Sequence, residues 1–187
     1  MEKRLNLGCG EFPKKGFVNV DIVKSADVVH DLDAFPYPFK KGEFDLIEAD
    51  HVLEHLENPF RVVKECHRIL APNGKLVVRV PHFSRGFSHP EHKRGFDVSF
   101  PLYFDPSFKG GYTGTSFKLE KMELHWFSQL YLKQKVLGKL SFAVGRVFGI
   151  AFDFLARLSP YACSRIWCYW VGGFEEIEFV FQKKGKN

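Results

Sequence analysis

The stretch that most constrains the fold is an apolar run that breaks at two glycines, followed by a second apolar run that ends in a carboxylate. The first run is Arg4–Leu7, the loop is Gly8–Gly10, and the second run, Phe17–Val20, leads into Asp21. Glycine lets the backbone approach a ligand closely, and an acid at the end of the next strand can accept hydrogen bonds from a ribose diol. The pattern predicts a nucleotide cradle between two adjacent strands. The third glycine of the dinucleotide-binding pattern is missing, because Pro13 stands there.

The rest of the first half alternates short apolar runs with helical patterns. Only nine residues, 8–16, connect the first two strands, whereas a crossover helix normally needs a dozen or more, so the first helix is shortened or absent. A helix is expected to begin at Asn58-Pro59, a capping residue followed by a first-turn proline. This alternation predicts an α/β fold with a mostly parallel sheet and helices on both faces. Further strands are expected at 28–31, 44–49, 75–81, near 122–126 and at 177–181, and further helices at 50–56 and 130–158.

Length and composition predict one domain with an elaborated second half. The chain has 187 residues, enough for one core, and its 21 Phe gather after residue 80. Residues 82–116 contain histidine, Phe, Gly and Pro in a pattern that predicts a long ordered loop or a small cap.

The net charge of +5 comes from the end of the chain. Residues 1–130 hold 18 basic and 18 acidic side chains, and the last 57 residues hold 9 basic and 4 acidic ones. Segment 130–170 is both basic and apolar, so it fits the core of a cap, a dimer contact or a surface that rests on a membrane. Arg146, Asp153 and Arg157 interrupt its apolar run and argue against a membrane span.

The four cysteines, Cys9, Cys66, Cys163 and Cys168, show no metal-binding or secreted spacing. They predict free buried thiols in a reducing compartment, and no signal peptide precedes the first strand, so we expect a cytoplasmic protein.

Six motifs in this order resemble the class I S-adenosylmethionine-dependent methyltransferases, especially the small members with a shortened first crossover. The resemblance covers residues 4–81 and, more loosely, 174–183. It implies a Rossmann-like seven-stranded sheet and a single methyltransferase domain over 1–187, with 82–126 and 128–173 as substrate-side elements. The motifs are Leu5–Gly10, Asp21, His30–Asp33 before Pro36–Phe39, Phe44–Ile47, His51–Leu56 and Arg68–Leu76.

The resemblance also implies which residues bind the cofactor, S-adenosylmethionine. The glycine loop would run against its methionine part, Asp21 would hold the ribose hydroxyls, and Asp31 would accept from the adenine amino group. The full set is Asn6, Gly8, Cys9, Gly10, Asp21, Ile22, Asp31, Leu32, Asp50 and His51. One departure is Asn6, since family members commonly have an acid there, and an amide lacks the charge that would favour the cofactor's ammonium.

Histidines are the candidate catalytic residues, because imidazole titrates in the useful range. His51 and His82 follow the fourth and fifth strands, where ligands gather in open α/β sheets, and His92 lies beside two basic residues. His55, one helical turn after His51, fits a packing or orienting role. His82, His89 and His92 could also bind zinc, but nothing in the sequence supplies supporting groups, so no metal is expected.

We therefore expect methyl transfer from S-adenosylmethionine to a small organic acceptor, at a hydroxyl or similar group. The alternatives are a cofactor-binding module without turnover, a nicotinamide oxidoreductase and a nucleic-acid methyltransferase, for which only the basic tail argues. The expected partner is a small molecule, with peripheral membrane contact or a homodimer through 130–170 left open.

Overall fold

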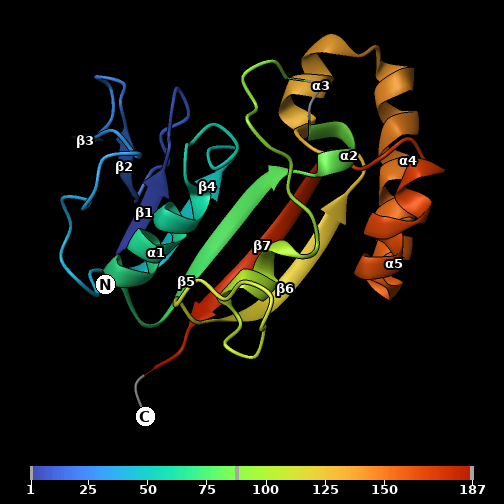
Figure 1. The fold of residues 1–187 in the computed structure, drawn as a ribbon. Coiled ribbons are helices and arrows are strands. Elements are labelled where there is room, and N and C mark those ends of the chain that lie inside the picture. The colour runs from blue at the N-terminus through green and yellow to red at the C-terminus, as the bar shows by residue number, and fades with distance from the viewer. Residues whose placement is uncertain (1, 87–88, 186–187) are drawn as a thin grey trace.

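The computed structural model describes residues 2–86 and 89–185. A single seven-stranded sheet runs through them in the order β3-β2-β1-β4-β5-β7-β6 (Figure 1). Neighbours among β1 to β5 are parallel, and β7 is antiparallel to both β5 and β6. The predicted mostly parallel α/β sheet is therefore confirmed. The strands are β1 (Arg4–Leu7), β2 (Val18–Asp21), β3 (Val28–Val29), β4 (Phe44–Asp50), β5 (Leu70–Pro81), β6 (Phe117–His125) and β7 (Glu176–Lys183).

No helix joins β1 to β2, as the short connection predicted. The loop turns back at once, since the backbone N–H of Phe12 donates to the carbonyl of Cys9 at 2.8 Å. Asn19 of β2 holds the middle of the loop, because its Oδ1 accepts from the backbone N–H of Lys14 at 2.7 Å. The described loop therefore closes over the ends of the strands without a helical layer.

Helix α1 (Pro59–Ile69) begins where Asn58 and Pro59 predicted. The Asn58 side chain accepts from the backbone N–H of Arg61 at 3.0 Å, which satisfies one of the free donors of the first turn. The buried face of α1, which includes Val62, Cys66 and Ile69, packs into the main core. This helix covers the apolar side of the sheet (Figure 1).

The prediction of a helix at 50–56 is wrong. Asp50 is the last residue of β4, residues 51–56 form bends and turns after it, and His51 has a left-handed backbone with φ of 51°. A right-handed helix cannot pass through such a residue, so the chain reverses at the mouth of β4 instead.

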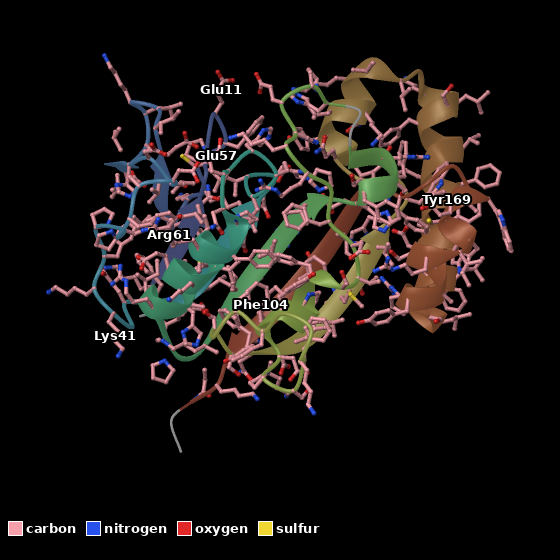
Figure 2. The ribbon with its side chains drawn as sticks, in the orientation of Figure 1. Glu11, Lys41, Glu57, Arg61, Phe104 and Tyr169 are labelled. Atoms are coloured by element: carbon pink, nitrogen blue, oxygen red, sulfur yellow. The ribbon has the colours of Figure 1, made fainter. Side chains whose placement is uncertain are left out.

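The second half adds short elements on one side of the sheet and, at the β6 edge, a helical arm formed by residues 130–165. The helix expected over 130–158 is two helices, which Gly138 separates. Phe104 belongs to a cluster of rings over the sheet (Figure 2), with its centroid 5.6 Å from that of Phe181. The elements are α2 (Phe83–Gly86), η1 (Phe100–Phe104), α3 (Leu130–Val136), α4 (Lys139–Leu158), α5 (Pro160–Arg165) and η2 (Trp167–Tyr169).

The two faces of the sheet differ in chemistry. On β7, Ile177, Phe179 and Phe181 are buried in the aromatic core, while the alternate residues Glu176 and Glu178 face the other side. Helix α4 approaches this polar side at the β6 edge, where Asp153 accepts from the backbone N–H of Trp126 at 2.7 Å. Helices therefore lie on both faces, but the polar face carries a row of charges.

Helix α4 exposes an apolar surface. Only Gly149 and Ala156 of its residues are buried, whereas Leu140 is 79% exposed and Phe154 is 62% exposed. No helix in the described ranges is long and apolar enough to cross a membrane. All four cysteines are free and buried, as expected.

Candidate functional site

The glycine loop after β1 needs its glycines for geometric reasons. Gly8 has φ of +72°, and a Cβ built on it would lie 2.4 Å from Cγ2 of Val52. Gly10 has φ of +47° but open space around it. The backbone N–H groups of Gly8 and Cys9 both donate to the carbonyl of Val20, at 2.9 and 3.1 Å. The loop is thereby fastened to β2, with its open side at Gly10.

Asp21, at the end of β2, supports the same loop. Its Oδ2 accepts from the backbone N–H of Gly10 at 2.8 Å, and its Oδ1 accepts from that of Ile22 at 2.7 Å. The Ile22 side chain is 68% exposed, so it offers an apolar surface beside the carboxylate.

Asp31 and Leu32 follow the end of β3. The Asp31 carboxylate is exposed and accepts from the backbone N–H of Asp33 at 2.9 Å. The Leu32 side chain is buried, and its carbonyl accepts from the hydroxyl of Tyr37 at 2.9 Å. The backbone N–H of His30 donates to the backbone carbonyl of Asp21 at 2.9 Å, which joins this segment to β2.

A cavity of about 530 Å³ opens beside the glycine loop. It brings together six of the ten residues that the sequence assigned to the cofactor. Asp21, Ile22, Asp31 and Leu32 do not line this cavity and stand at the ends of β2 and β3. The six are Asn6, Gly8, Cys9, Gly10, Asp50 and His51.

Of these six residues, Asn6 has a structural role and Cys9 is unsuited to act as a nucleophile. The Asn6 side chain donates to Oδ1 of Asn19 at 3.0 Å and to the carbonyl of Phe12 at 3.3 Å, so its amide holds the loop. Cys9 is buried, and burial together with Asp21 raises the pKa of its thiol, which makes it a poor nucleophile.

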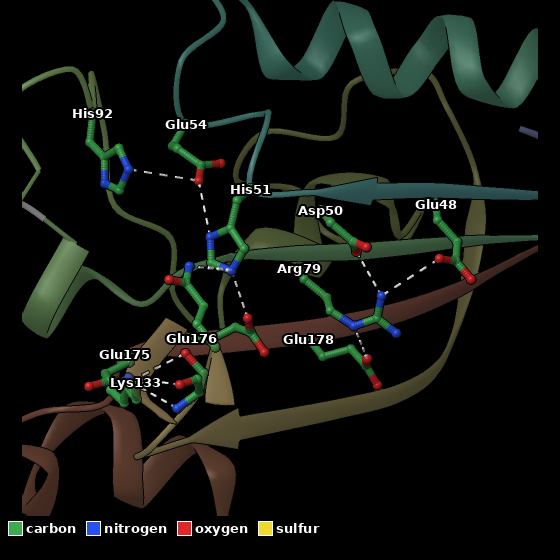
Figure 3. A network of polar contacts seen from close by, with 12 residues as sticks. Glu48, Asp50, His51, Glu54, Arg79, His92, Lys133, Glu175, Glu176 and Glu178 are labelled. Carbon is green, nitrogen blue, oxygen red and sulfur yellow. Dashed lines mark hydrogen bonds and ion pairs between the residues drawn. The ribbon is translucent and has the colours of Figure 1, made fainter. Parts of the chain in front are cut away.

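His51 lies at the inner end of the cavity. Its Nε2 is 2.7 Å from a carboxylate oxygen of Glu176, and its Nδ1 is 3.3 Å from Oε1 of Glu54 (Figure 3). Burial lowers the pKa of His51, but the two carboxylates outweigh burial and raise this pKa to about 9. At neutral pH the imidazole therefore carries a proton on both nitrogens, and it donates hydrogen bonds rather than accepting a proton.

A second cavity, of about 710 Å³, meets the first at His51 and Gln129, which line both. The side-chain nitrogen of Gln129 lies 3.2 Å from Nε2 of His51. Besides His51 and Gln129, the second cavity is lined by residues from the end of β5 and the segment after it, by residues next to and within α3, and by Glu175. These residues are Pro81, Phe83, Ser84, Arg85, His89, His92, Ser128 and Lys133. The Glu175 carboxylate balances the positive charges of Arg85 and Lys133 in this cavity. It accepts a hydrogen bond from Arg85 at 2.9 Å and another from Lys133.

A row of alternating charges crosses the polar face of the sheet next to the first cavity. Arg79 donates to Asp50 at 2.7 Å and to Glu178 at 2.7 Å (Figure 3). Lys14, from the loop after β1, pairs with Asp50 and Glu48. The lysine and the arginine hold the pKa of Asp50 below its usual range although burial raises it, so this residue remains a carboxylate.

The structure separates the three histidines that the sequence could assign to zinc. His82 is completely buried, its two ring nitrogens lie 2.7 and 2.9 Å from the hydroxyls of Ser84 and Ser164, and it lines neither cavity. Burial lowers the pKa of His82 to about 4. His89 and His92 instead stack on each other at the second cavity, with ring centroids 4.8 Å apart.

Sequence reasoning missed Lys14, Gln129 and Glu176. The only sequence signal for Glu176 was the alternation of acids with apolar residues along the last strand. Gln129 gave no signal at all, since its contact with His51 spans 78 residues of chain.

Known proteins share this sequence pattern and this fold. Residues 14–78 match the family model described as a methyltransferase domain. Over 90 residues the chain is 32% identical to the protein named Methyltransferase str3 of Strobilurus tenacellus, and the alignment covers 48% of this chain and 27% of that protein. The chain thus spans about a quarter of that relative's length.

Solved structures share the fold over nearly the whole chain. A SAM-dependent methyltransferase from Archaeoglobus fulgidus superposes with a TM-score of 0.58 at 19% identity, covering 97% of this chain and 86% of that one. An S-adenosylmethionine-dependent methyltransferase from Mesorhizobium loti gives 0.57 at 13% identity, covering 96% and 90%. The cyclase SpnF gives 0.55 at 15% identity, covering 99% and 75%, so this fold also occurs in a protein named for another reaction.

The family and the fold imply S-adenosylmethionine as the cofactor, and the residues present fit it. Gly10 leaves open space at the cavity, with nothing within 4 Å of an added Cβ. Asp21 places a carboxylate at the end of β2, and Asp50 and Glu176 offer carboxylates to a cation inside the cavity. Residues 14–78 therefore resemble a methyltransferase domain, and the chain has the fold of the class I S-adenosylmethionine-dependent methyltransferases.

Proposed function

We propose that the protein is an S-adenosylmethionine-dependent methyltransferase that acts on a small organic acceptor through a hydroxyl or similar group. The observation that carries this proposal is the pair of adjoining cavities that share His51 and Gln129. The glycine loop lines one cavity, and most residues that line the other follow β5 in the chain. Two adjoining chambers suit a reaction in which a group passes between two bound molecules.

In this proposal the cofactor occupies the first cavity and extends over the ends of β2 and β3. Gly8, Cys9 and Gly10 present backbone to the methionine part, while Asp21 accepts from the ribose hydroxyls. Ile22 covers a face of the adenine, and Asp31 with the Leu32 amide contacts its edge. Asp50, which remains ionised beside Lys14 and Arg79, faces the methionine end with Asn6 and His51.

When bound, S-adenosylmethionine would supply an electrophilic methyl group on a sulfonium, and the proton that the acceptor hydroxyl exchanges for this methyl group would pass to solvent. The protein contributes mainly position and exclusion of water. His51 is held between Glu176 and Glu54, so its donor groups are fixed at the boundary of the cavities. His92 lines the acceptor side, whereas His82 receives no role because it lines neither cavity.

The second cavity favours a small polar acceptor. Its walls mix Phe83 and Pro81 with charged and hydroxyl groups, among them Arg85, Lys133 and Ser84. Most of these walls come from 82–126 and 128–173, which supports a substrate-side role for both segments. A nucleic-acid acceptor is disfavoured because the basic excess of 130–170 is interleaved with exposed apolar side chains.

Calorimetric titration with S-adenosylmethionine tests the first half of the proposal. We expect one site per chain, and the absence of binding by well-folded protein would overturn the proposal. Formation of demethylated cofactor in the presence of a metabolite panel tests turnover. Binding without any acceptor-dependent product would instead support a cofactor-binding module.

The helical arm supports a second proposal about location. We infer that α4 rests on an anionic lipid surface. Val147, Ile150, Phe154 and Leu158 follow helical spacing and are all exposed, and residues 130–170 hold six basic side chains against one acid. Tyr169 points outward at the same end of the molecule (Figure 2). Apolar and basic side chains on one exposed helix favour the interface of an anionic bilayer.

Flotation with vesicles tests this location. We expect binding to phosphatidylglycerol-containing vesicles but not to pure phosphatidylcholine, and a several-fold loss on Phe154→Ser or Arg146→Gln. Lys41→Gln is the charge-matched control, since Lys41 lies on the side of the molecule away from Tyr169 (Figure 2). No vesicle binding, or a dimer in solution that Phe154→Ser dissolves, would overturn the lipid assignment. The cytoplasmic location stays a prediction.

A further inference from the structure

A buried acid lies behind the acceptor cavity without a hydrogen bond. The Glu54 side chain is 0% exposed, and neither of its carboxylate oxygens has a hydrogen-bond partner among the described residues. Buried carboxylates are costly unless they are paired, hydrogen-bonded or bound to a metal ion. The protonated His51 lies 3.3 Å from Oε1 of Glu54, which leaves the rest of the buried carboxylate available to a second cation.

Histidines surround this carboxylate. Glu54, His55 and His92 each offer one ligand atom, and these atoms all lie within 4.8 Å of one another. Nε2 of His92 is 3.9 Å from Oε1 of Glu54 (Figure 3). The rings of His55 and His92 have centroids 5.0 Å apart. Two imidazoles and one carboxylate converge on one point.

The backbone holds these side chains in place from two segments. The N–H of Lys93 donates to the carbonyl of Glu54 at 2.9 Å, which joins the loop that carries His92 to the turn after β4. Nδ1 of His55 lies 3.3 Å from the carbonyl of Glu91. A histidine that donates through one nitrogen to a carbonyl leaves the other nitrogen free to bind a metal, which is the usual arrangement around metal-ligating histidines.

We propose that Glu54, His55 and His92 bind a divalent transition-metal ion, with zinc as the ion that fits best. Two histidines and one glutamate form a known set for zinc sites that keep a fourth position open. Ligands at zinc distances stand roughly 3.4 Å apart in a tetrahedron, so side-chain movements of about 1 Å would close the site.

The fourth coordination position of the ion would be available to the acceptor. His92 lines the second cavity, so an ion held by it borders the space where the acceptor binds. An acceptor hydroxyl that takes the fourth position would be held by its oxygen and would lose its proton more readily. This role rests on the proposed methyl transfer, whereas the binding of the metal does not.

Metal binding can be measured without activity. The full chain is freed of metal with a chelator and titrated with ZnCl₂ by calorimetry, and with Co²⁺ by visible absorption, which reports tetrahedral coordination. Wild type should bind one ion per chain. Glu54→Gln and His92→Gln should each weaken zinc binding by at least about 100-fold. His67→Gln, on α1 and in contact with Phe117, is the matched histidine control and should bind like wild type.

A thermal readout separates a metal site from a structural acid. We expect zinc to raise the melting temperature of wild type but not that of Glu54→Gln, whatever the difference between the two metal-free proteins, because Glu54→Gln also removes the partner of the protonated His51. Should Glu54→Gln fail to fold, His92→Gln carries the same comparison. The proposal is overturned if wild type binds no zinc, or if both variants bind it as wild type does. Titration with S-adenosylmethionine under the same conditions shows whether the proposed function stands regardless of that result.

Discussion

The imidazole of His51 and the side-chain amide of Gln129 meet at 3.2 Å, and both residues have left-handed backbones, with φ of 51° and 49°. Asn73 is the third non-glycine residue with positive φ among those described. Such conformations cost free energy and persist where the surrounding structure enforces them, often at functional sites. The pair stands where the two cavities join, so the strained backbone aims two polar side chains at the proposed point of transfer.

Gln129 can be tested with two truncations that differ only in backbone freedom. Gln129→Ala and Gln129→Gly both remove the amide, but glycine adopts φ of 49° at little cost. We expect the glycine variant to be more stable than the alanine variant by about 1 kcal/mol in urea unfolding, and both to lose methyl transfer to a similar extent. Equal stability of the two variants would show that the backbone at Gln129 is not strained, and full activity in both would remove the amide from the site.

The two glycines of the first loop should respond differently to alanine. Gly8→Ala combines a left-handed backbone with a Cβ 2.4 Å from Val52, whereas Gly10→Ala meets the same backbone penalty with no neighbour within 4 Å. We expect Gly8→Ala to lower the free energy of unfolding by about 3 kcal/mol and Gly10→Ala by about 1 kcal/mol. Chemical denaturation measures both. A cost for Gly10→Ala as large as that for Gly8→Ala would contradict the assigned clash.

The sequence predicted those parts of the fold in which local pattern and tertiary packing agree. Asn58 and Pro59 mark the start of α1 because capping is a local property, and the apolar runs mark the strands because each is buried. The turn after β4 was predicted as a helix, since Val52, Leu53 and Leu56 have helical spacing. Only the left-handed backbone of His51, which depends on its tertiary contacts, excludes that helix.

The candidate site also contains residues that the sequence pointed to and residues that it did not. The proximity of residues 8–10 and Asp21 could be predicted from the sequence, because the loops that follow neighbouring parallel strands meet at one edge of the sheet. Glu176 could not, since 125 residues separate it from His51 and acids on the exposed face of a strand are common. Glu54 looked like one residue of a short helix, and only its complete burial beside two histidines sets it apart.

The acid at the end of β2 should control cofactor affinity. Asp21→Asn removes the charge that would face the ribose hydroxyls, and charge-assisted hydrogen bonds are the stronger kind. We expect S-adenosylmethionine affinity to fall roughly 10- to 100-fold by calorimetry, with the fold retained by circular dichroism. Asp27→Asn is the matched control, because Asp27 also accepts from a backbone N–H, that of Asn19 at 2.8 Å, yet has no proposed contact with the cofactor. Equal losses in both variants would refute a ribose contact at Asp21.

His82 should make the protein sensitive to mild acid. Its pKa is about 4 in the folded protein, below the value near 6.5 of an unfolded histidine, because burial disfavours the charged ring. The unfolded chain therefore takes up a proton as the pH falls below about 6.5, whereas the folded chain does not until about pH 4, so stability decreases through this window by up to about 3 kcal/mol. His82→Gln keeps a side chain that can bond to Ser84 and Ser164 but does not titrate. Urea unfolding at pH 7 and pH 4.5 should show a smaller difference between the two pH values in His82→Gln than in wild type. An unchanged difference would show that other groups, and not His82, set the acid limit of this fold.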